Sequence, residues 1–195
     1  SIFSIQVSVP WWRDQSYYDE PGRGTYERDG GGVLISQAIH TLDLMLSLVG
    51  PVKEVQAISH TTNFHKMESE DFVAGGMKFE NGAIGSLFAT TSSFPGYAES
   101  ITLNCEKASA QLQSGVLTIN WLDGRLEKFG ETSGTGGGAD PMAFPYEWHR
   151  DLIENFIQSI KKNSDFSVTG EEALKVHLLI DALIESSQKG QFVKI

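Results

Sequence analysis

The chain has 195 residues, a formal net charge of −10 at pH 7 and a pI near 4.9. This length suits one domain with a sizeable core. The acidic balance disfavours nucleic acid as a partner, because a phosphate backbone is bound through clustered Lys and Arg. The apolar runs look shorter than the roughly 20 residues that cross a bilayer, so we expect no membrane role.

The lone cysteine, Cys105, cannot form an internal disulfide, and the start lacks a charged and then apolar leader. We therefore expect a cytoplasmic protein. Strand-like alternation runs over Ile2–Pro10, directly from a start without Met, which favours a fragment of a longer chain. The segment from Trp11 to Asp29 contains turn residues and is predicted to be an irregular loop.

An apolar run from Val33 to Val49 ends at Gly50-Pro51 and predicts a buried helix, apolar almost all round. The middle, from Val52 to Phe129, alternates like an antiparallel meander. Asn81-Gly82 and Asp123-Gly124 favour two-residue hairpin turns there. Cys105 is interpreted as a small buried hydrophobe in this region.

The C-terminal third begins with a glycine-rich loop from Glu131 to Pro145. Its run from Gly134 to Gly138 lacks the order of a phosphate-binding loop and favours a mobile loop or lid. A helix follows whose apolar stripe should cover a core, formed by Leu152, Ile153, Phe156, Ile157 and Ile160. A last helix starts with a capping box, Thr169 and Glu172, and ends at Gly190 before a strand-like tail.

These elements predict one α+β domain over residues 1–195, a largely antiparallel open-faced sheet with helices packed on one face. On the first long helix, Ser36, His40, Asp43 and Ser47 share a narrow strip, bordered by Gln37. Imidazole titrates near neutrality, and Asp43 one turn away could orient it, as an acid/base catalyst requires. A hydrogen-bonded core histidine without catalytic function fits the same spacing.

Aromatic side chains and an arginine follow the first strand, a combination that suits a sugar with apolar faces and a rim of hydroxyls. The group comprises Trp11, Trp12, Arg13, Gln15, Tyr17 and Tyr18. The alternative is that one Trp fills the core and the two Tyr pack on the surface. The predicted substrate-binding residues are Trp12, Arg13, Tyr17, Ser36, Gln37 and His149.

His149 shares the side of Ile153 and Phe156 and contacts either a substrate or only the core. His60, His65 and His177 have no such sequence context. No His, Cys or carboxylate pair has metal-ligand spacing, so we expect no metal site.

The run from Gly30 to Leu44, closed by Gly50-Pro51, resembles the C-terminal domain of the glucose–fructose oxidoreductase and inositol dehydrogenase (Gfo/Idh/MocA) family. The resemblance continues through Glu70-Asp71, Asn81-Gly82 with Gly85, and the stretch from Gly170 through Ser186 to Gly190. It implies the fold of the dihydrodipicolinate-reductase-like C-terminal domain. It also implies homo-oligomers paired through the open sheet face.

The resemblance further implies that His40 is the acid/base residue for a sugar hydroxyl. NAD or NADP would be bound mainly by an N-terminal dinucleotide-binding domain that this chain lacks. That domain would also supply a catalytic lysine. Many members carry an aspartate where this chain has Ser36, whereas Asp43 matches the His-x-x-Asp pattern and either orients His40 or anchors the helix.

The predicted function is therefore the substrate-binding domain of an NAD(P)-dependent oxidoreductase acting on a CH–OH group of a sugar, polyol or sugar derivative. The fragment alone should be inactive. The alternative is a non-catalytic carbohydrate-binding or scaffold protein with the same fold. An upstream sequence without a dinucleotide fingerprint would favour that alternative.

Overall fold

The computed structural model describes residues 1–132, 146–164, 166 and 168–195. The predicted loop from Gly134 to Gly138 therefore lies outside the described residues. The strands are β1 (Ile2–Pro10), β2 (Val52–His60), β3 (Phe72–Phe79), β4 (Ile84–Thr90), β5 (Ser100–Cys105), β6 (Ala108–Gln113), β7 (Val116–Trp121), β8 (Leu126–Phe129) and β9 (Val193–Lys194). The helices are α1 (Gln15–Tyr18), α2 (Tyr26–Asp29), the π-helix η1 (Leu34–Ala38), α3 (Ile39–Val49), α4 (Glu147–Lys162) and α5 (Gly170–Lys189).

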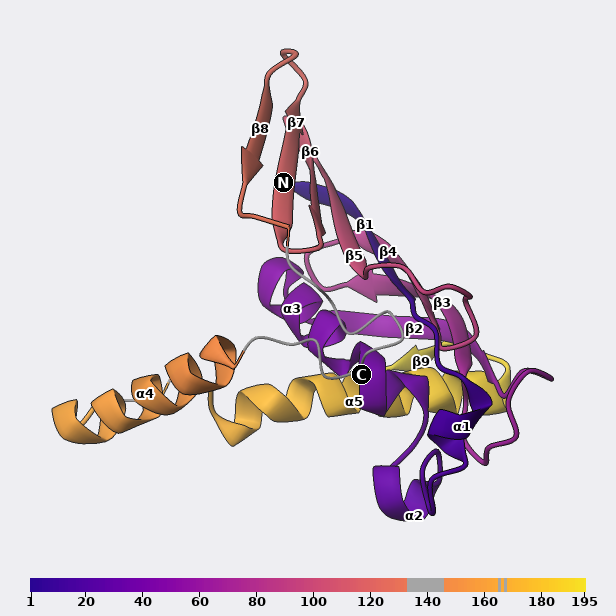
Figure 1. Ribbon diagram of the computed structural model, residues 1–195. Coiled ribbons are helices and arrows are strands. Elements are labelled where there is room, and N and C mark those ends of the chain that lie inside the picture. Colours follow the sequence, from indigo (N-terminus) through magenta and orange to yellow (C-terminus); the bar gives the residue numbers. More distant parts are fainter. Residues whose placement is uncertain (133–145, 165, 167) are drawn as a thin grey trace.

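The strands form one nine-stranded sheet in the order β8-β7-β6-β5-β1-β4-β3-β2-β9 (Figure 1). β1 lies between β5 and β4, antiparallel to the first and parallel to the second. The expected single meander is therefore wrong, because β1 separates one antiparallel group, β2–β4, from another, β5–β8. Hydrogen bonds from both neighbours satisfy β1 along its length, which places the first strand in the middle of the sheet.

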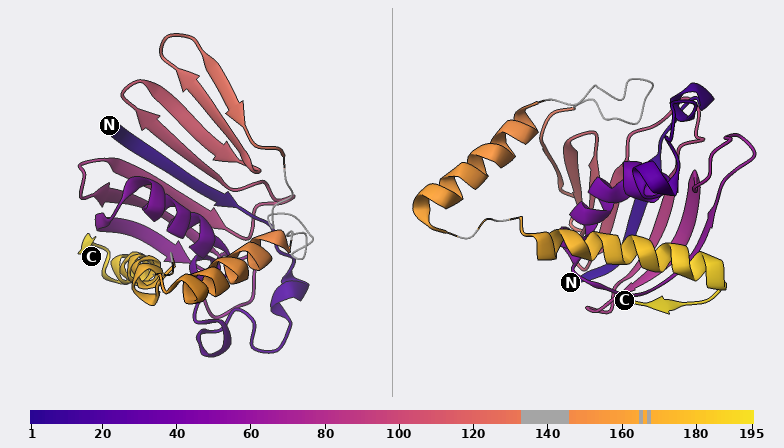
Figure 2. Two further views of the ribbon diagram at one scale, coloured as in Figure 1. Left: turned by 90° about the vertical axis from the view of Figure 1, so that its left-hand side faces the viewer. Right: turned by 90° about the horizontal axis from the view of Figure 1, so that it is seen from below.

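α3 and α5 cover one face of the sheet, and no helix of the described residues covers the other face (Figure 2). The core lies between these layers and includes Val7, Val9, Leu42, Met45, Leu179 and Leu183. Ser186 connects the layers, since its buried hydroxyl accepts from Ala57 N at 3.1 Å and donates to Gln191 O at 2.6 Å. This arrangement confirms the predicted α+β class with helices on one face.

The first long helix was expected to be a buried helix with a polar strip, and it is buried on one face only. Leu42 and Met45 face the sheet and are fully buried, but the predicted strip of Ser36, His40 and Asp43 is exposed. The first turns are π-helical over Leu34–Ala38, and the helix becomes α-helical at Ile39. π-helical turns are rare and occur frequently at functional sites.

The hairpins lie where predicted but have different turns. The β3–β4 and β7–β8 connections each span four residues, 80–83 and 122–125, and only their glycines, Gly82 and Gly124, have positive φ. The Asn81 side chain instead accepts from Ala83 N and donates to Val49 O, which holds a wider loop. A two-residue turn with positive φ at both positions joins β6 to β7 at Ser114-Gly115, φ 52° and 79°.

The segment from Trp11 to Asp29 is more regular than predicted. It contains α1 and α2, whose N-termini are capped by the side chains of Asp14 and Thr25. By length and composition alone, the helical stretch Tyr26–Val49 would suffice to cross a membrane, contrary to our expectation. Half of its apolar window is buried within the domain, and one such stretch is weak evidence of a span, because core helices of globular domains pass the same test.

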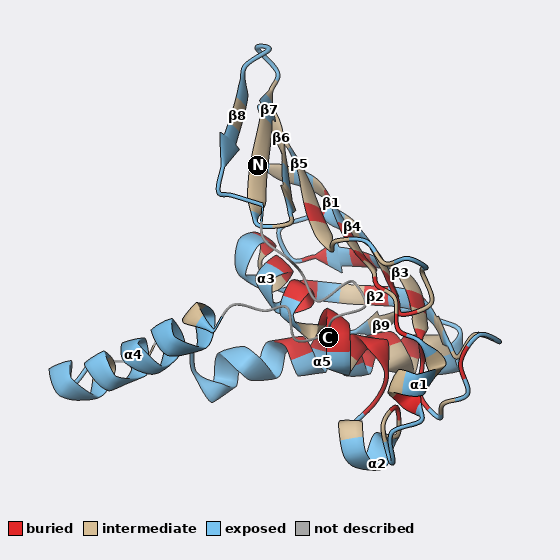
Figure 3. Cartoon of the chain, in the orientation of Figure 1, coloured by how far each residue is buried: buried red, intermediate tan, exposed pale blue. Residues whose placement is uncertain are grey.

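α4 projects away from the rest of the domain (Figure 1), and none of its residues is buried. The predicted stripe exists, but all five of its residues are exposed, Leu152, Ile153, Phe156, Ile157 and Ile160 (Figure 3). The expectation that this helix covers a core of the same domain is therefore wrong. Cys105 also differs from expectation, since it is only half-buried.

Candidate functional site

A cleft of about 650 Å³ opens on the helix side of the sheet, between η1–α3, the end of β1, β5, the β6–β7 turn and the start of α4. It is lined by Trp11, Arg13, Tyr17, Ser36, Gln37, His40, Thr41, Leu44, Glu99, Ser100, Ile101, Leu112, Gln113, Ser114, Gly115, Trp148, His149 and Leu152. Six of the predicted catalytic and substrate-binding residues meet here, namely His40, Arg13, Tyr17, Ser36, Gln37 and His149.

The helical wall carries Ser36, Gln37 and His40. The Ser36 hydroxyl lies 2.9 Å from Gln37 Oε1, and Gln37 Nε2 donates to the Tyr17 hydroxyl at 3.4 Å. Gln37 is buried, and its contact with Tyr17 connects η1 to α1. His40 lies one turn further along and is exposed at the cleft.

The floor of the cleft is an aromatic and cationic group at the end of β1. The Arg13 guanidinium lies 5.2 Å from the Trp11 ring centroid and 5.4 Å from that of Tyr17. The Arg23 guanidinium also lies over the Tyr17 ring, 4.3 Å from its centroid, and donates to the Tyr17 hydroxyl at 2.9 Å. Such contacts between cations and ring faces fix the orientation of the side chains.

Two parts of the cleft were missed in the sequence. Glu99 accepts a hydrogen bond from Trp11 Nε1 at 3.0 Å and adds a carboxylate to the wall. The Ser114-Gly115 turn between β6 and β7 also lines the cleft. A Ser-Gly dipeptide is a recognised turn signal and could have identified this turn, but no local pattern marks Glu99.

Trp12 and Asp43 are not among the residues that line this cleft. The Trp12 ring contacts Phe64 and Phe94, with ring centroids 4.9 and 5.2 Å away. Strand alternation explains this placement, since Trp11 and Arg13 point to the cleft and Trp12 to the opposite side. Asp43 lines a separate cavity of about 360 Å³ between α3 and α5.

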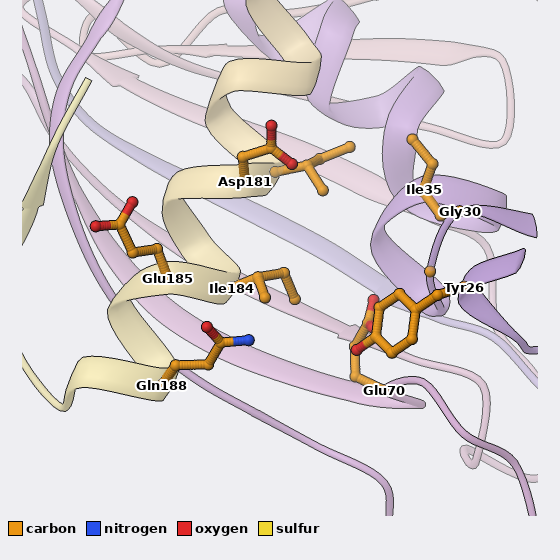
Figure 4. A pocket seen from close by; sticks show the side chains of 10 residues that line it. Tyr26, Gly30, Ile35, Glu70, Asp181, Ile184, Glu185 and Gln188 are labelled. Atoms are coloured by element: carbon orange, nitrogen blue, oxygen red, sulfur yellow. The ribbon is translucent and has the colours of Figure 1, made fainter.

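A third cavity, of about 400 Å³, lies between α5 and the start of η1 and contains Glu70 (Figure 4). Its carboxylate is buried and accepts from Gly32 N and Leu34 N, both at 3.1 Å. Burial raises the pKa of Glu70 above its ordinary value, although these backbone hydrogen bonds oppose the rise. Glu70 thus caps the helix that carries His40.

The glycine run before η1 does not fit a phosphate group, because its helix terminus already holds the Glu70 carboxylate. Val33 N also donates to Glu70 O, at 2.8 Å. A Cβ at Gly32 would lie 1.8 Å from that same oxygen, which explains the glycine. Among the described residues there is no group of three His, Cys, Asp or Glu that could hold a metal ion.

The chain is thus an open-faced α+β domain with a cleft between its helical layer and the strand ends, a common place for a small-molecule site. The family model described as "GFO/IDH/MocA C-terminal domain" matches residues 1–111, more than half of the sequence. The chain belongs to this family, as its glycine-histidine helix predicted. No curated protein matches it.

Among solved structures, the chain is similar to WlbA dehydrogenases crystallised with NADH and UDP-GlcNAcA. The protein from Bordetella pertussis is 28% identical with a TM-score of 0.77, over all of this chain and 54% of that one. The protein from Chromobacterium violaceum is 29% identical and has the same TM-score, and the match covers 100% of this chain and 55% of that one. A levoglucosan dehydrogenase is 20% identical with a TM-score of 0.78, and the match covers 100% of this chain and 59% of that one. At this identity the likeness shows the shared fold alone. The chain thus spans little more than half the length of these relatives.

Proposed function

We propose that this chain is the substrate-binding half of an NAD(P)-dependent oxidoreductase acting on a CH–OH group of a sugar, polyol or sugar derivative. The observation that carries the proposal is the convergence of His40, Arg13, Tyr17, Ser36, Gln37 and His149 on one cleft. A cleft with aromatic surfaces and several hydrogen-bonding side chains suits a polyhydroxylated ligand. The relatives named above are NADH-bound dehydrogenases, which supports the reaction type.

His40 is the proposed acid/base residue, because it is the imidazole on the helical wall of the cleft. In the oxidation, a neutral His40 ring nitrogen takes the proton of the substrate hydroxyl, and in the reduction the imidazolium returns it. Gln37 and Tyr17 form part of the wall around the sugar. A separate dinucleotide-binding domain would hold the nicotinamide, which would supply the hydride acceptor for the substrate carbon.

The first ligand to test is UDP-GlcNAcA, because two relatives are named for complexes with it. Arg13 lines the cleft and offers a guanidinium for an acidic group, beside the carboxylate of Glu99. Binding to the isolated chain by calorimetry, compared with a neutral sugar such as glucose, tests this choice.

The decisive experiment replaces His40 in the full-length protein. We expect His40→Ala to lower kcat for sugar oxidation roughly 10²- to 10⁴-fold, the usual contribution of a positioned acid/base group. Absorbance of the reduced nicotinamide measures turnover. His60→Ala, at an exposed histidine at the end of β2, is the matched control and should retain full activity. Unchanged turnover in His40→Ala would remove the assigned role.

Sugar binding without any turnover in the full-length protein would favour the alternative of a carbohydrate-binding or scaffold protein. We also propose a cytoplasmic setting and a homo-oligomer paired through the open sheet face. The sheet supports the oligomer, because the helices cover only its other face.

A further inference from the structure

A second histidine, His65, is completely buried beneath the floor of the cleft. Its Nδ1 lies 2.7 Å from Asp71 Oδ2, and the side chains of both residues have no exposed surface. Its Nε2 lies 3.0 Å from the carbonyl oxygen of Arg13. His65 therefore joins the segment between β2 and β3 to the peptide of a cleft residue 52 positions earlier.

The two contacts determine the protons on the ring. A carbonyl oxygen can only accept, so Nε2 must donate to Arg13. The Asp71 carboxylate also accepts from Thr62 N at 2.7 Å and from Thr62 Oγ1 at 2.6 Å, which favours its ionised form. Because imidazole is more basic than a carboxylate, the shared proton belongs to Nδ1. The ring then carries both protons and a positive charge, balanced by Asp71.

We propose that His65 is an imidazolium that acts as a positioning residue, holding the Arg13 peptide and thereby the floor of the cleft. This role rests on the proposed function. Arg13 N donates to Thr91 O at 2.8 Å, and Thr91 N donates to Asp71 O at 3.0 Å. Two residues that bond to Asp71 therefore hold the Arg13 backbone. Thr91 accepts from its N–H, and His65 donates to its carbonyl oxygen. A shift of this peptide would move the Arg13 side chain, which contacts Trp11 and Tyr17.

Tyr18 and Asp14 are further titratable side chains near the His65–Asp71 ion pair, which has no net charge of its own. The Tyr18 ring packs on His65 with centroids 4.7 Å apart, and its hydroxyl bonds to Thr91 Oγ1 at 2.8 Å. Burial raises the pKa of the Tyr18 hydroxyl, so it stays uncharged. The Asp14 carboxylate interacts with His65 electrostatically from an exposed position. The Glu70 carboxylate is directed to the backbone N–H groups of Gly32 and Leu34.

The first test measures the protons directly on the unmodified chain. Nitrogen-15 NMR of the His65 ring near neutral pH should show both nitrogens protonated, each coupled to its own hydrogen. One deprotonated ring nitrogen would overturn the proposal. This readout does not depend on sugar binding and remains valid if the proposed function fails.

The second test uses two substitutions that each retain one of the two donors. The amide nitrogen of Gln occupies the place of Nε2, and that of Asn the place of Nδ1. His65→Gln should keep the Arg13 contact, whereas His65→Asn should lose it. Amide exchange at Arg13 and the indole Nε1–H signal of Trp11 report the position of the floor. The control is His60→Asn, at an exposed position near the same segment.

We expect His65→Asn to speed exchange at Arg13, shift the Trp11 signal and weaken UDP-GlcNAcA binding on the order of tenfold, as when a residue that orients a ligand-contacting group is lost. His65→Gln should restore most of each property, and His60→Asn should match the wild type. If Asn and Gln have equal effects on Arg13 and Trp11, His65 only fills the core and the positioning role is overturned. If the wild type binds no UDP-GlcNAcA, the ligand proposal fails, while exchange at Arg13 still decides the role of His65.

Discussion

At the scale of single residues, two adjacent carboxylates outside the cleft hold its helical wall and its floor. Glu70 caps the helix with Ser36 and His40, and Asp71 holds His65 and through it Arg13. Burial would raise the pKa of both groups. Hydrogen bonds from His65 and Thr62 outweigh burial at Asp71 and leave its pKa below the ordinary value, whereas the pKa of Glu70 is raised.

The lowered pKa of Asp71 predicts a pH-dependent contribution to stability. Its ionised form is favoured in the folded state, so this stability is present above the unfolded pKa, about 3.9, and is lost as the pH falls through the lower folded value. Asp71→Asn should lower the free energy of unfolding by about 3 kcal/mol near neutral pH, as for a broken buried pair. The difference from the wild type should shrink below about pH 4.

Urea unfolding over a series of pH values measures this difference. Asp123→Asn, an exposed carboxylate in the β7–β8 loop, is the control and should change stability little at any pH. A difference for Asp71→Asn that stays constant down to strongly acidic pH would contradict the assigned ionised pair.

Residue spacing could predict His40 but not His65. His40 belongs to a helical strip whose period is visible in the sequence. The partners of His65 lie six residues away across a loop and 52 residues away in another element, and neither separation is a helical or strand period. Contacts that depend on how distant segments meet leave no local pattern.

At the scale of elements, the start of the His40 helix depends on Glu70. The first backbone N–H groups of a helix have no partner within it, and here a buried carboxylate accepts two of them. Gly32 permits the close approach, because any side chain there would overlap the Glu70 carbonyl. Gly32, the last of the three glycines before η1, is thus explained by the contact with Glu70.

Glu70→Gln should weaken both the helix start and the cleft. The new amide group places a donor against one of the two backbone N–H groups, and a buried unsatisfied donor costs about 1–3 kcal/mol. Urea unfolding should show this loss, and UDP-GlcNAcA binding should weaken because Ser36, Gln37 and His40 follow directly. Glu80→Gln, at an exposed residue in the β3–β4 loop, should leave both properties unchanged. Wild-type stability in Glu70→Gln would show that the cap contributes little.

Periodicity predicted which elements exist better than it predicted where they lie. The apolar stripe of α4 was visible in the sequence, yet in the structure it contacts no core. Amphipathic spacing predicts that one face of a helix packs on an apolar surface, but it does not determine which surface. Likewise, the alternation of β1 indicated a strand, but pairing with β4 and β5 arises from contacts about 80 to 100 residues apart.

At the scale of the whole molecule, the sheet has one covered face and one open face. Strand alternation places Gln6, Ser8 and Thr102 on the open face, beside larger apolar residues. Among these, Ile58 and Ile84 are 68% and 59% exposed. A broad face with small polar side chains and exposed isoleucines suits pairing with another sheet better than contact with water.

The proposed homo-oligomer can therefore be tested on this face. Replacing both Ile58 and Ile84 by Lys introduces two charges into the predicted interface, and an unpaired buried charge is costly. Sedimentation at micromolar concentration should give an oligomeric mass for the wild type and the monomer mass for the double variant. Circular dichroism should show that the double variant retains the fold.

The control is Ile160→Lys on α4, at a residue that is 65% exposed but away from the open face. This variant should remain oligomeric. A monomeric wild type, or a double variant with unchanged mass, would contradict assembly through the open sheet. Loss of the oligomer in Ile160→Lys alone would instead assign the contact to α4.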